Sequence, residues 1–599
     1  MKAGAADRDR AAVEAAIARA GGLAQAGRLR EAVDGLQRDG AAMAHPAGCN
    51  ALGTLLMQGG AVQSALVCFD RAVALAPAFA DAQSNRGVAL QELGRLEEAL
   101  AAFRAALKAA PGHLNALMNS GSVLKLLGRG DEAVQVFDRV LSLRPDLAEA
   151  ALKRAYLHME GGNHAASLED FERVLKQQPD NGEAALGRVS ALTSLRRYDE
   201  ALAGIDLIIA ARPADAEARV ARGQILVELE RPAEALALAG DLVRRGLGGS
   251  MAEIVQAAAL WRLGRHGEAI AAAEAAMRSY PSEVQIRQAL SNYYLGTGDF
   301  VRGWQAYEFR SGTFDRKQAA FEKQAPRWAG EDLTGKTILV FAEQGIGDTI
   351  QFARFLVSLA EAGAAIKALV QPALLRLVRS LPAPVSWFDR PGDVGSFDYQ
   401  IPLLSLPRVF GTEIDSIPGA VPYLTAEPEK VAAWRQRIGS GGYRIGVVWQ
   451  GNPRYGADHR RSVPLEHFAP LAALPGVRLI SLQAVHGLDQ LAALPEGMAV
   501  ETLGDRITAN PDGVSEVAAA MSALDLVVAS DTAIAHLAGA LGRPVWLALS
   551  DDPDWRWLFD RADSPWYPTM RLFRQTVRGD WTGVFAEMAA ALGDKVGAP

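Results

Sequence analysis

Two short stretches of this sequence place polar residues where a strand passes into a helix. The first, KTILVFAEQGIGDTIQFARFL at residues 336–356, has an apolar run, a glycine turn and then a helical pattern. Gly345 and Gly347 make this turn typical of a loop that cradles a phosphate. Asp348, however, occupies the place where the phosphate would lie, and its carboxylate would repel an anion. Asp348 is also well suited to cap the helix that follows.

The second stretch is DLVVASDTAIAHLAGALGRPVWLALS at residues 525–550. The run LVVA predicts a buried strand, and Asp531 and Thr532 then fall at the start of a helix. The free N–H groups and positive dipole end of such a helix favour a diphosphate. His536 lies about one turn further along on the same face. Helix capping by Asp531 and Thr532, and core packing by His536, are the simpler alternatives.

Other patterns of catalytic residues are weaker. Asp552 and Asp554 form the motif D-x-D, which elsewhere holds a divalent cation beside a nucleotide sugar, but three letters are a common match. We expect these two aspartates to serve as loop and cap residues, Trp555 and Trp557 to pack against the domain, and no metal to bind. The serine-hydrolase and P-loop motifs are absent, and GIGDTI lacks the third glycine of a dinucleotide fingerprint.

The N-terminal half repeats with a period of 34 residues, shown by four phenylalanines at 69, 103, 137 and 171. Further columns keep the same period: Pro77, Pro111, Pro145, Pro179 and Pro213; Ala65, Ala99, Ala133 and Ala201; and the small residues Gly53, Gly87, Gly121 and Ala155. This period, with a small residue at a helix crossing and a proline closing each unit, predicts tetratricopeptide repeats.

Each repeat leaves an apolar face that only its neighbours cover, so the array should stack into a solenoid with a concave groove. We place the solenoid at residues 1–310, with a poorly repeating N-terminal cap at about 1–45. Such grooves resemble peptide- and protein-binding modules. A spacer or an oligomerisation surface is the alternative.

Beyond a turn-rich connector at 311–335, short apolar runs alternate with helical segments, which predicts parallel α/β sheets. A proline- and glycine-rich region between them divides this half into lobes at 336–430 and 440–599. Two Rossmann-like lobes facing a cleft suggest the GT-B fold of glycosyltransferases. The predicted strands cover residues 337–342, 365–370, 385–388, 399–402, 444–449, 477–482, 524–529 and 545–549.

Composition narrows the class of protein. The chain has 599 residues, 49% of them hydrophobic and 22% charged, which is ordinary for a globular protein of several domains. A net charge of −7 gives no indication of nucleic-acid binding. Only Cys49 and Cys68 are present, which excludes a disulfide framework. Because no apolar run approaches about 18 residues, we expect a cytoplasmic protein without a membrane span.

The motifs of the second half carry a specific resemblance over residues 336–590. GIGD and SDTAIAH resemble those of heptosyltransferase-like GT-B enzymes. The match is closer to bacterial proteins that fuse such a domain to tetratricopeptide repeats, a group that includes flagellin glycosyltransferases. The architecture is also similar to that of O-linked N-acetylglucosamine transferase. The motifs shared with the bacterial group are QGIGDTIQFAR, PLLSLPRVFGT, GVVWQGNP, RRSVPLEHF, SLQ, SDTAIAHLAGALGRPVW and DWRWLFDRADSPWYPTMRLFRQ.

The resemblance implies a role for particular residues. Asp348 would be the general base on the acceptor side, in a loop with Gln344, Gly345 and Gly347. Asp531, Thr532 and His536 would contact the nucleotide diphosphate. Further candidates for binding the nucleotide sugar are Asn452, Arg460, Arg461, Gln450 and Gln483. Arginine pairs suit a phosphate or a sugar carboxylate because the guanidinium donates two parallel hydrogen bonds, but such pairs are also common on solvated surfaces.

Taken together, the resemblance implies an inverting, metal-independent protein O-glycosyltransferase. A nucleotide sugar is the co-substrate, with a CMP-linked nonulosonic acid such as pseudaminic acid as the leading donor and Ser or Thr of flagellin as the acceptor, recruited by the repeats. The loop after the first strand of the second lobe carries arginines where heptosyltransferases commonly place a lysine, which leaves the sugar open. Two alternatives stay open: a heptosyltransferase-like enzyme of lipopolysaccharide or capsule assembly, and a non-catalytic repeat scaffold.

Overall fold

The structure is a computed structural model that describes residues 2–310, 321–453, 455–504, 507 and 512–596, with side chains from residue 10 to residue 595. Residues 311–320 of the predicted connector lie outside this range. The chain divides into two compact units, Met1–Leu238 and Ala239–Pro599, and each is described by itself. The predicted fold class, a helical solenoid followed by an α/β part, is confirmed.

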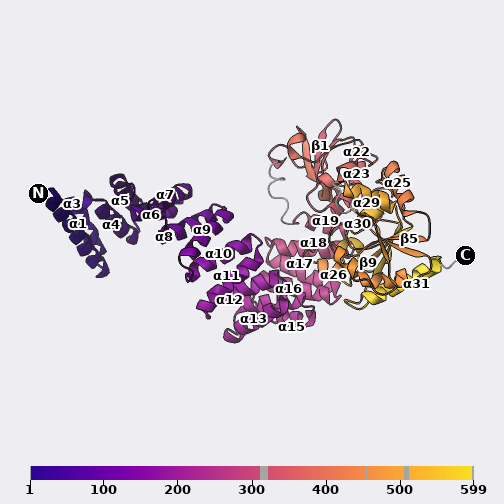
Figure 1. Ribbon diagram of the computed structural model, residues 1–599, viewed down its shortest axis with the longest axis horizontal. Coiled ribbons are helices and arrows are strands. Elements are labelled where there is room, and N and C mark those ends of the chain that lie inside the picture. Colours follow the sequence, from indigo (N-terminus) through magenta and orange to yellow (C-terminus); the bar gives the residue numbers. More distant parts are fainter. Residues whose placement is uncertain (1, 311–320, 454, 505–506, 508–511, 597–599) are drawn as a thin grey trace. The chain divides into compact units, whose positions relative to one another are not determined.

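The first unit is a succession of antiparallel helix pairs (Figure 1). The small residues of the repeat lie where the two helices of a pair cross. A Cβ atom on Gly53 would lie 2.5 Å from the Phe69 ring, and one on Gly87 would lie 2.5 Å from the Phe103 ring. The rings are fully buried, so each phenylalanine fills the space that the glycine leaves. The helices are α1 (Lys2–Gln25), α2 (Leu29–Arg38), α3 (Gly40–Met43), α4 (Pro46–Gln58), α5 (Val62–Leu75), α6 (Ala80–Glu92), α7 (Leu96–Ala109), α8 (Leu114–Leu126), α9 (Gly130–Leu143), α10 (Ala148–Glu160), α11 (His164–Gln177), α12 (Gly182–Ser194), α13 (Tyr198–Ala211) and α14 (Ala216–Glu228).

The second unit contains both sheets and the last helices of the helical array. Helix α15 (Pro232–Arg244) crosses the boundary, and α16 (Gly249–Arg262), α17 (His266–Ser279), α18 (Val284–Gly296) and α19 (Phe300–Tyr307) follow. These last helices therefore share one compact unit with the α/β lobes.

Helix α19 is built into the core of the second unit. Trp304 packs edge-on against Phe352 at a ring-centroid distance of 6.1 Å and against Trp555 at 5.4 Å. Phe352 belongs to the first lobe and Trp555 to the second, so one helical side chain contacts both. Trp304 is almost completely buried. Burial of this large ring stabilises the junction of α19 with the two lobes by an amount on the order of 2–3 kcal/mol.

The first lobe has a four-stranded parallel sheet in the order β3-β2-β1-β4. The central strand β1 is a buried apolar run, as expected for a parallel strand covered on both faces, whereas the edge strand β3 is only partly buried. Helices α21 (Ile346–Phe352) and α22 (Phe355–Glu361) connect β1 to β2. The strands are β1 (Thr337–Phe341), β2 (Ala365–Leu369), β3 (Val385–Phe388) and β4 (Tyr399–Pro402).

The second lobe has a six-stranded parallel sheet in the order β10-β9-β8-β5-β6-β7. Four of its strands match the predicted ones within two residues at each end, whereas β7 and β10 were not predicted. Helices α25 (Pro428–Ile438), α29 (Gly513–Met521), α30 (Ala533–Ala540) and α31 (Trp581–Val596) accompany this sheet. The strands are β5 (Tyr443–Val448), β6 (Val477–Ser481), β7 (Val500–Thr502), β8 (Leu526–Ser530), β9 (Val545–Leu549) and β10 (Met570–Arg574).

Candidate active site

The glycine turn after β1 presents Asp348 on the first turn of helix α21. Gly345 is the N-cap residue and Asp348 the third helical residue, so Asp348 does cap the helix, but from inside its first turn and not as the N-cap residue. Its Oδ2 accepts a hydrogen bond from the Gly345 N–H at 2.9 Å. An acid at this position satisfies the exposed N–H of the cap residue and favours the positive end of the helix.

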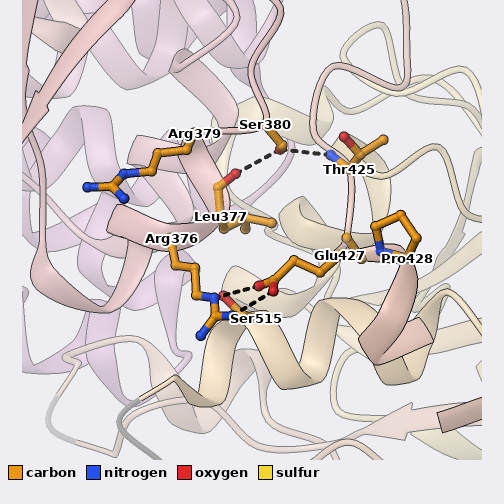
Figure 2. A pocket seen from close by; sticks show the side chains of 9 residues that line it. Arg376, Leu377, Arg379, Ser380, Thr425, Glu427, Pro428 and Ser515 are labelled. Atoms are coloured by element: carbon orange, nitrogen blue, oxygen red, sulfur yellow. Dashed lines mark hydrogen bonds and ion pairs between the residues drawn. The ribbon is translucent and has the colours of Figure 1, made fainter. Parts of the chain in front are cut away.

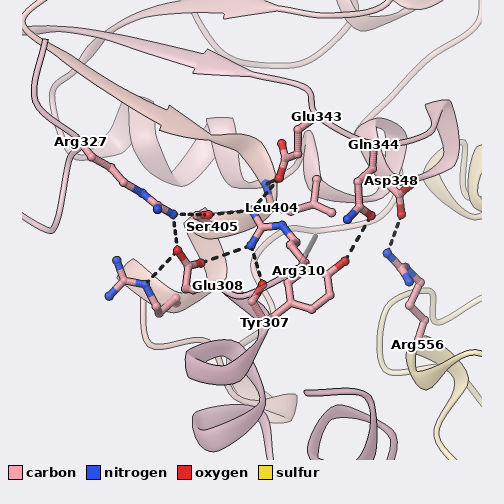
Figure 3. A network of polar contacts seen from close by, with 11 residues as sticks. Tyr307, Glu308, Arg310, Arg327, Glu343, Gln344, Asp348, Leu404, Ser405 and Arg556 are labelled. Atoms are coloured by element: carbon pink, nitrogen blue, oxygen red, sulfur yellow. Dashed lines mark hydrogen bonds and ion pairs between the residues drawn. The ribbon is translucent and has the colours of Figure 1, made fainter. Parts of the chain in front are cut away.

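The other carboxylate oxygen of Asp348 faces an arginine of the second lobe. Arg556 donates from Nη2 to Asp348 Oδ1 at 2.5 Å, and Figure 3 shows the two side chains meeting across the lobes. Burial raises the pKa of the Asp348 carboxyl above its ordinary value, and the Arg556 charge opposes that rise. About a fifth of the Asp348 side chain is exposed, so a substrate could reach it.

The second predicted stretch forms the strand and helix expected of it. Strand β8 ends at Ser530, and Thr532 is the N-cap residue of α30, with no hydrogen bond from its side chain to the helix. Within the described part of the chain, the buried hydroxyls of Ser530 and Thr532 have no hydrogen-bond partner. Unpartnered buried hydroxyls are costly, and a bound anion at this helix start could satisfy both the hydroxyls and the backbone N–H groups.

The two helix starts touch. A Cβ atom on Gly347 of α21 would lie 3.2 Å from the Cα of Ala533 and 3.2 Å from Cδ2 of His536, both in α30. Only a residue without a side chain allows this approach. The geometry therefore brings the turn that carries Asp348 and the turn that carries Asp531 to one junction.

His536 is buried among aromatic rings at this junction. Its Nδ1 is hydrogen-bonded to the Tyr567 hydroxyl at 3.0 Å, and its ring stacks on Trp557 at a centroid distance of 5.1 Å. Burial and the neighbouring arginine charges, first that of Arg556, lower the pKa of His536 well below its ordinary value. The imidazole is therefore neutral at pH 7. Packing, the simpler interpretation of this histidine, accounts for these contacts.

Asp531 lies in a crowded group of charges. Burial and the Asp554 carboxylate raise the pKa of Asp531 to about 6, while Arg461 and Arg556 act in the opposite direction. With Asp348, this group holds three carboxylates and two guanidinium groups. A buried site of mixed charge with shifted pKa values is typical of a functional site.

The loop after β5 contributes one of the two predicted arginines to this group. The Arg461 Nε donates to Asp458 Oδ1 at 3.1 Å, and its guanidinium lies 4.5 Å from the centre of the Tyr455 ring. Arg460 instead lies 3.8 Å from Asp552. Asn452 belongs to the same loop and takes part in contacts of its own.

The two predicted glutamines hold strand ends together. Gln483 Oε1 accepts from the backbone N–H groups of Trp449 and Gln450 at 3.1 and 3.2 Å, and its Nε2 donates to the Gln450 carbonyl at 2.8 Å. Gln450 Oε1 accepts from Gln490 Nε2 at 3.1 Å. The Gln483 amide thus joins the ends of β5 and β6 with both of its polar atoms, which disfavours a role in binding a ligand.

The D-x-D motif is occupied by protein groups. Asp552 accepts hydrogen bonds from Trp261 and Arg262 of α16, and Asp554 caps a short helical turn by accepting from the Arg556 N–H at 3.0 Å. Among the described residues, no group of three or more His, Cys, Asp and Glu side chains is arranged to hold a metal ion. The loop and cap roles expected of these aspartates agree with these contacts.

A buried network joins the end of the helical array to the turn before Asp348 (Figure 3). Arg310 Nη2 donates to Glu343 Oε1 at 2.7 Å and to Ser405 Oγ at 2.8 Å. The Tyr307 hydroxyl and Gln344 Oε1 are 3.3 Å apart. Both anchored residues, Glu343 and Gln344, immediately precede Gly345, so this network fixes the base of the turn.

A surface pocket lies away from this junction. It has a volume of about 280 Å³ and lies where the first lobe meets the segment leading into α25 (Figure 2). Arg376 closes one side by pairing with Glu427 at 2.6 Å and with Asp512 at 2.8 Å. None of the predicted site residues lines this pocket.

Sequence reasoning missed Arg556, which connects more of the site than any predicted residue does. The stretch DWRW begins one of the motifs that carry the resemblance, but only Asp554, Trp555 and Trp557 within it were given roles. An arginine between two buried tryptophans was the available signal, because a charge in such a setting must be paired.

Comparison with known proteins supports the interpretation of the helical array. A family model described as tetratricopeptide repeat matches residues 50–113, 89–148, 152–216 and 220–284. These matches fall on the helix pairs described above. The solenoid is built of tetratricopeptide repeats.

One curated protein resembles a larger share of the chain. Protein FlbA of Caulobacter vibrioides is 28% identical over 360 residues, which cover 54% of this chain and 57% of FlbA. The match thus spans little more than half the length of that relative.

Solved structures resemble parts of the chain. A tetratricopeptide repeat protein from Parabacteroides merdae is 19% identical with a TM-score of 0.33, and covers 41% of this chain and 97% of its own. YrrB is 22% identical with a TM-score of 0.27, and the match covers 29% of this chain and 89% of YrrB. PilF of Pseudomonas aeruginosa is 19% identical with a TM-score of 0.31, and the match covers 35% of this chain and 95% of PilF.

No helix in the part of the chain that the structure describes is long and apolar enough to cross a membrane.

Proposed function

We propose that this protein is a glycosyltransferase that moves a sugar from a nucleotide donor to a serine or threonine hydroxyl of a protein held by its repeats. The observation that carries the proposal is the junction of α21 and α30. There, Asp348 from one lobe and the helix start after Asp531 from the other lie together, with unpartnered hydroxyls beside them.

The donor phosphate binds at the start of α30 in this mechanism. Backbone N–H groups, the Thr532 hydroxyl and the local dipole balance its negative charge, and Arg461 adds a cation. The neutral His536 ring, held by its hydrogen bond with Tyr567, forms a fixed wall of this phosphate-binding site.

Asp348 acts as the general base. The acceptor oxygen attacks the anomeric carbon, its proton passes to the Asp348 carboxylate, and the bond from the anomeric carbon to the phosphate oxygen breaks with its electron pair leaving on the phosphate. Direct attack inverts the anomeric centre. A raised pKa suits this role, because a base is most effective when its pKa approaches the working pH.

The repeats recruit the acceptor. Tetratricopeptide repeats are protein-binding arrays, and here the last helix of the array is part of the same unit as the site. The motifs shared with bacterial flagellin glycosyltransferases favour flagellin as the acceptor and a CMP-linked nonulosonic acid as the donor. A carboxylate on such a sugar would also suit the arginines of the loop after β5.

Intact-mass spectrometry of flagellin tests the proposal. Flagellin from cells that express the wild-type protein should carry the mass of one or more sugars, and flagellin from cells without the protein should lack it. Identical masses would refute the flagellin assignment. A lipopolysaccharide or capsule change in the same cells would instead support the heptosyltransferase-like alternative.

A further inference from the structure

Arg556 is held by acids and amides from both lobes. Its Nη2 donates to Asp348 of the first lobe, its Nη1 donates to Asp554 of its own lobe at 2.9 Å, and its Nε donates to Gln351 Oε1 at 2.7 Å. The guanidinium also lies 4.3 Å from the centre of the Trp555 ring. Each edge of the side chain therefore has a partner, and 7% of the residue is exposed.

The Arg556 guanidinium lies within electrostatic reach of the phosphate-binding site proposed at the start of α30. Its charge acts on Asp531, at the start of α30, and on His536, one turn into that helix. The second nearby cation, Arg461, is already paired with Asp458 at 3.1 Å. An anion that arrives at the start of α30 therefore enters a site rich in carboxylates, where it competes with Asp348 and Asp554 for Arg556.

We propose that Arg556 is a positioning residue that exchanges partners: it holds Asp348 before the donor binds, and it turns its Nη2 edge to the leaving phosphate once the donor is bound. This inference rests on the proposed function. Asp554 keeps the Nη1 edge throughout, so the guanidinium pivots while it stays anchored. Phosphate suits the exchange because its oxygens can accept from the same fork of N–H groups that a carboxylate uses.

The exchange links donor binding to the strength of the base. While it is paired with Arg556, the Asp348 carboxylate is stabilised in its ionised form and is a poor proton acceptor. After the exchange Asp348 keeps the hydrogen bond from the Gly345 N–H, while its own burial and the Asp554 charge still favour its protonated form. Asp348 becomes a better base only when a donor is present.

Nucleotide affinity tests the exchange without relying on transfer. The probe is whichever of CMP, UMP, UDP, GDP and ADP stabilises the wild-type protein most, and calorimetry measures its Kd. Asp348→Asn removes the competing carboxylate, so the nucleotide should bind at least about fivefold more tightly. Arg556→Met should weaken binding by at least about fivefold.

The double variant isolates the coupling between the two residues. Asp348→Asn should give no gain in affinity when Arg556 is already methionine, since the carboxylate then has no cation to compete for. If Arg556→Met fails to fold, Arg556→Lys replaces it in the cycle and should show a smaller gain. The matched control is Arg561→Met, because Arg561 pairs with Asp563 in the same lobe and should leave Kd unchanged.

The exchange would be overturned if Asp348→Asn bound the nucleotide no more tightly than wild type, or if its gain in affinity persisted in the Arg556→Met background. In either case the proposed function would still stand, provided that the wild-type protein binds a nucleotide. If none of the five nucleotides binds the wild-type protein, the proposed function fails and the exchange fails with it.

Discussion

The Asp348 carboxylate lies 2.5 Å from the Arg556 guanidinium, although the two residues are 208 positions apart in the chain. This pair joins the four-stranded lobe to the six-stranded lobe at the point where α21 meets α30. In the proposed mechanism the general base and the phosphate-binding site must face the same space, and the contact of α21 with α30 supports that arrangement.

Transfer should depend on the ionisation of Asp348. Since burial raises the pKa of this carboxyl, the base loses activity as the pH falls through that raised value. Below it, kcat/KM should drop by about tenfold per pH unit. The measurement is a pH profile of sugar transfer, with exposed Asp393→Asn in the same lobe as a control that should keep the wild-type profile. A profile that stays flat on the acidic side would contradict the assignment of the base.

The Asp531 carboxylate should lower the free energy of unfolding at neutral pH. The folded state keeps the Asp531 proton up to a pH of about 6, whereas the unfolded chain releases it near 3.8. Between these values the folded state binds more protons, so the free energy of unfolding falls as the pH rises, and the full cost is present above about pH 6. Asp531→Asn should therefore raise the free energy of unfolding at pH 7.5 by roughly 1–3 kcal/mol.

Urea denaturation of both proteins at several pH values measures this difference. The gain of Asp531→Asn should shrink towards zero only as the pH falls below the value of 3.8 at which the unfolded chain releases the proton, because wild-type Asp531 is then protonated in both states. A gain that is independent of pH, or a loss at neutral pH, would show that the carboxylate is not strained by its surroundings.

Gly347→Ala should push the two lobes apart. The added methyl group would lie 3.2 Å from Ala533 and from His536, which belong to the rigid start of α30. We expect a loss of roughly 1–3 kcal/mol in the free energy of unfolding and reduced transfer. Gly392→Ala is the matched control, because no atom lies within 4 Å of a Cβ there. Equal behaviour of the two variants would mean that the contact is loose.

Gly121→Ala tests the helix crossing of the repeats. A Cβ atom at Gly121 would lie 2.7 Å from the Phe137 ring, and the resulting overlap should outweigh the gain in helix propensity, at a net cost of roughly 1–3 kcal/mol. Gly35→Ala, in helix α2 with open space around it, should instead stabilise by about 0.5–1 kcal/mol. Chemical denaturation monitored by helical circular dichroism distinguishes them. The same sign for both variants would be inconsistent with the packing described.

The sequence was sufficient to predict most of the fold because its patterns are periodic and local. The residues that recur every 34 positions do so because the same helix crossing is repeated. Strand β1 is a continuous apolar run because a parallel strand is buried on both faces. Strand β7 has three residues and two of them are exposed, so it left no apolar run. Strand β10 places Arg571 and Arg574 among its apolar residues, which hid it as well.

The candidate site was only partly predictable for a different reason. Asp348 follows β1 of the four-stranded sheet, and Asp531 and His536 follow β8 of the six-stranded sheet; a strand followed by a turn and a helix is a local signal. The pairing of Asp348 with Arg556 depends on how two lobes fold against each other, and no local pattern records it. For Gln483 the position at a strand end was correct, but its amide holds backbone groups in place.

The central claim is that Asp348 is the base of a sugar transfer. The most direct measurement is the intact mass of flagellin after incubation with purified protein and a CMP-linked nonulosonic acid, compared for wild type, Asp348→Asn and Asp393→Asn. Wild type and Asp393→Asn should add the sugar mass, while Asp348→Asn should slow its addition by at least about a hundredfold and still melt cooperatively. Addition of the sugar by Asp348→Asn at the wild-type rate would contradict the account.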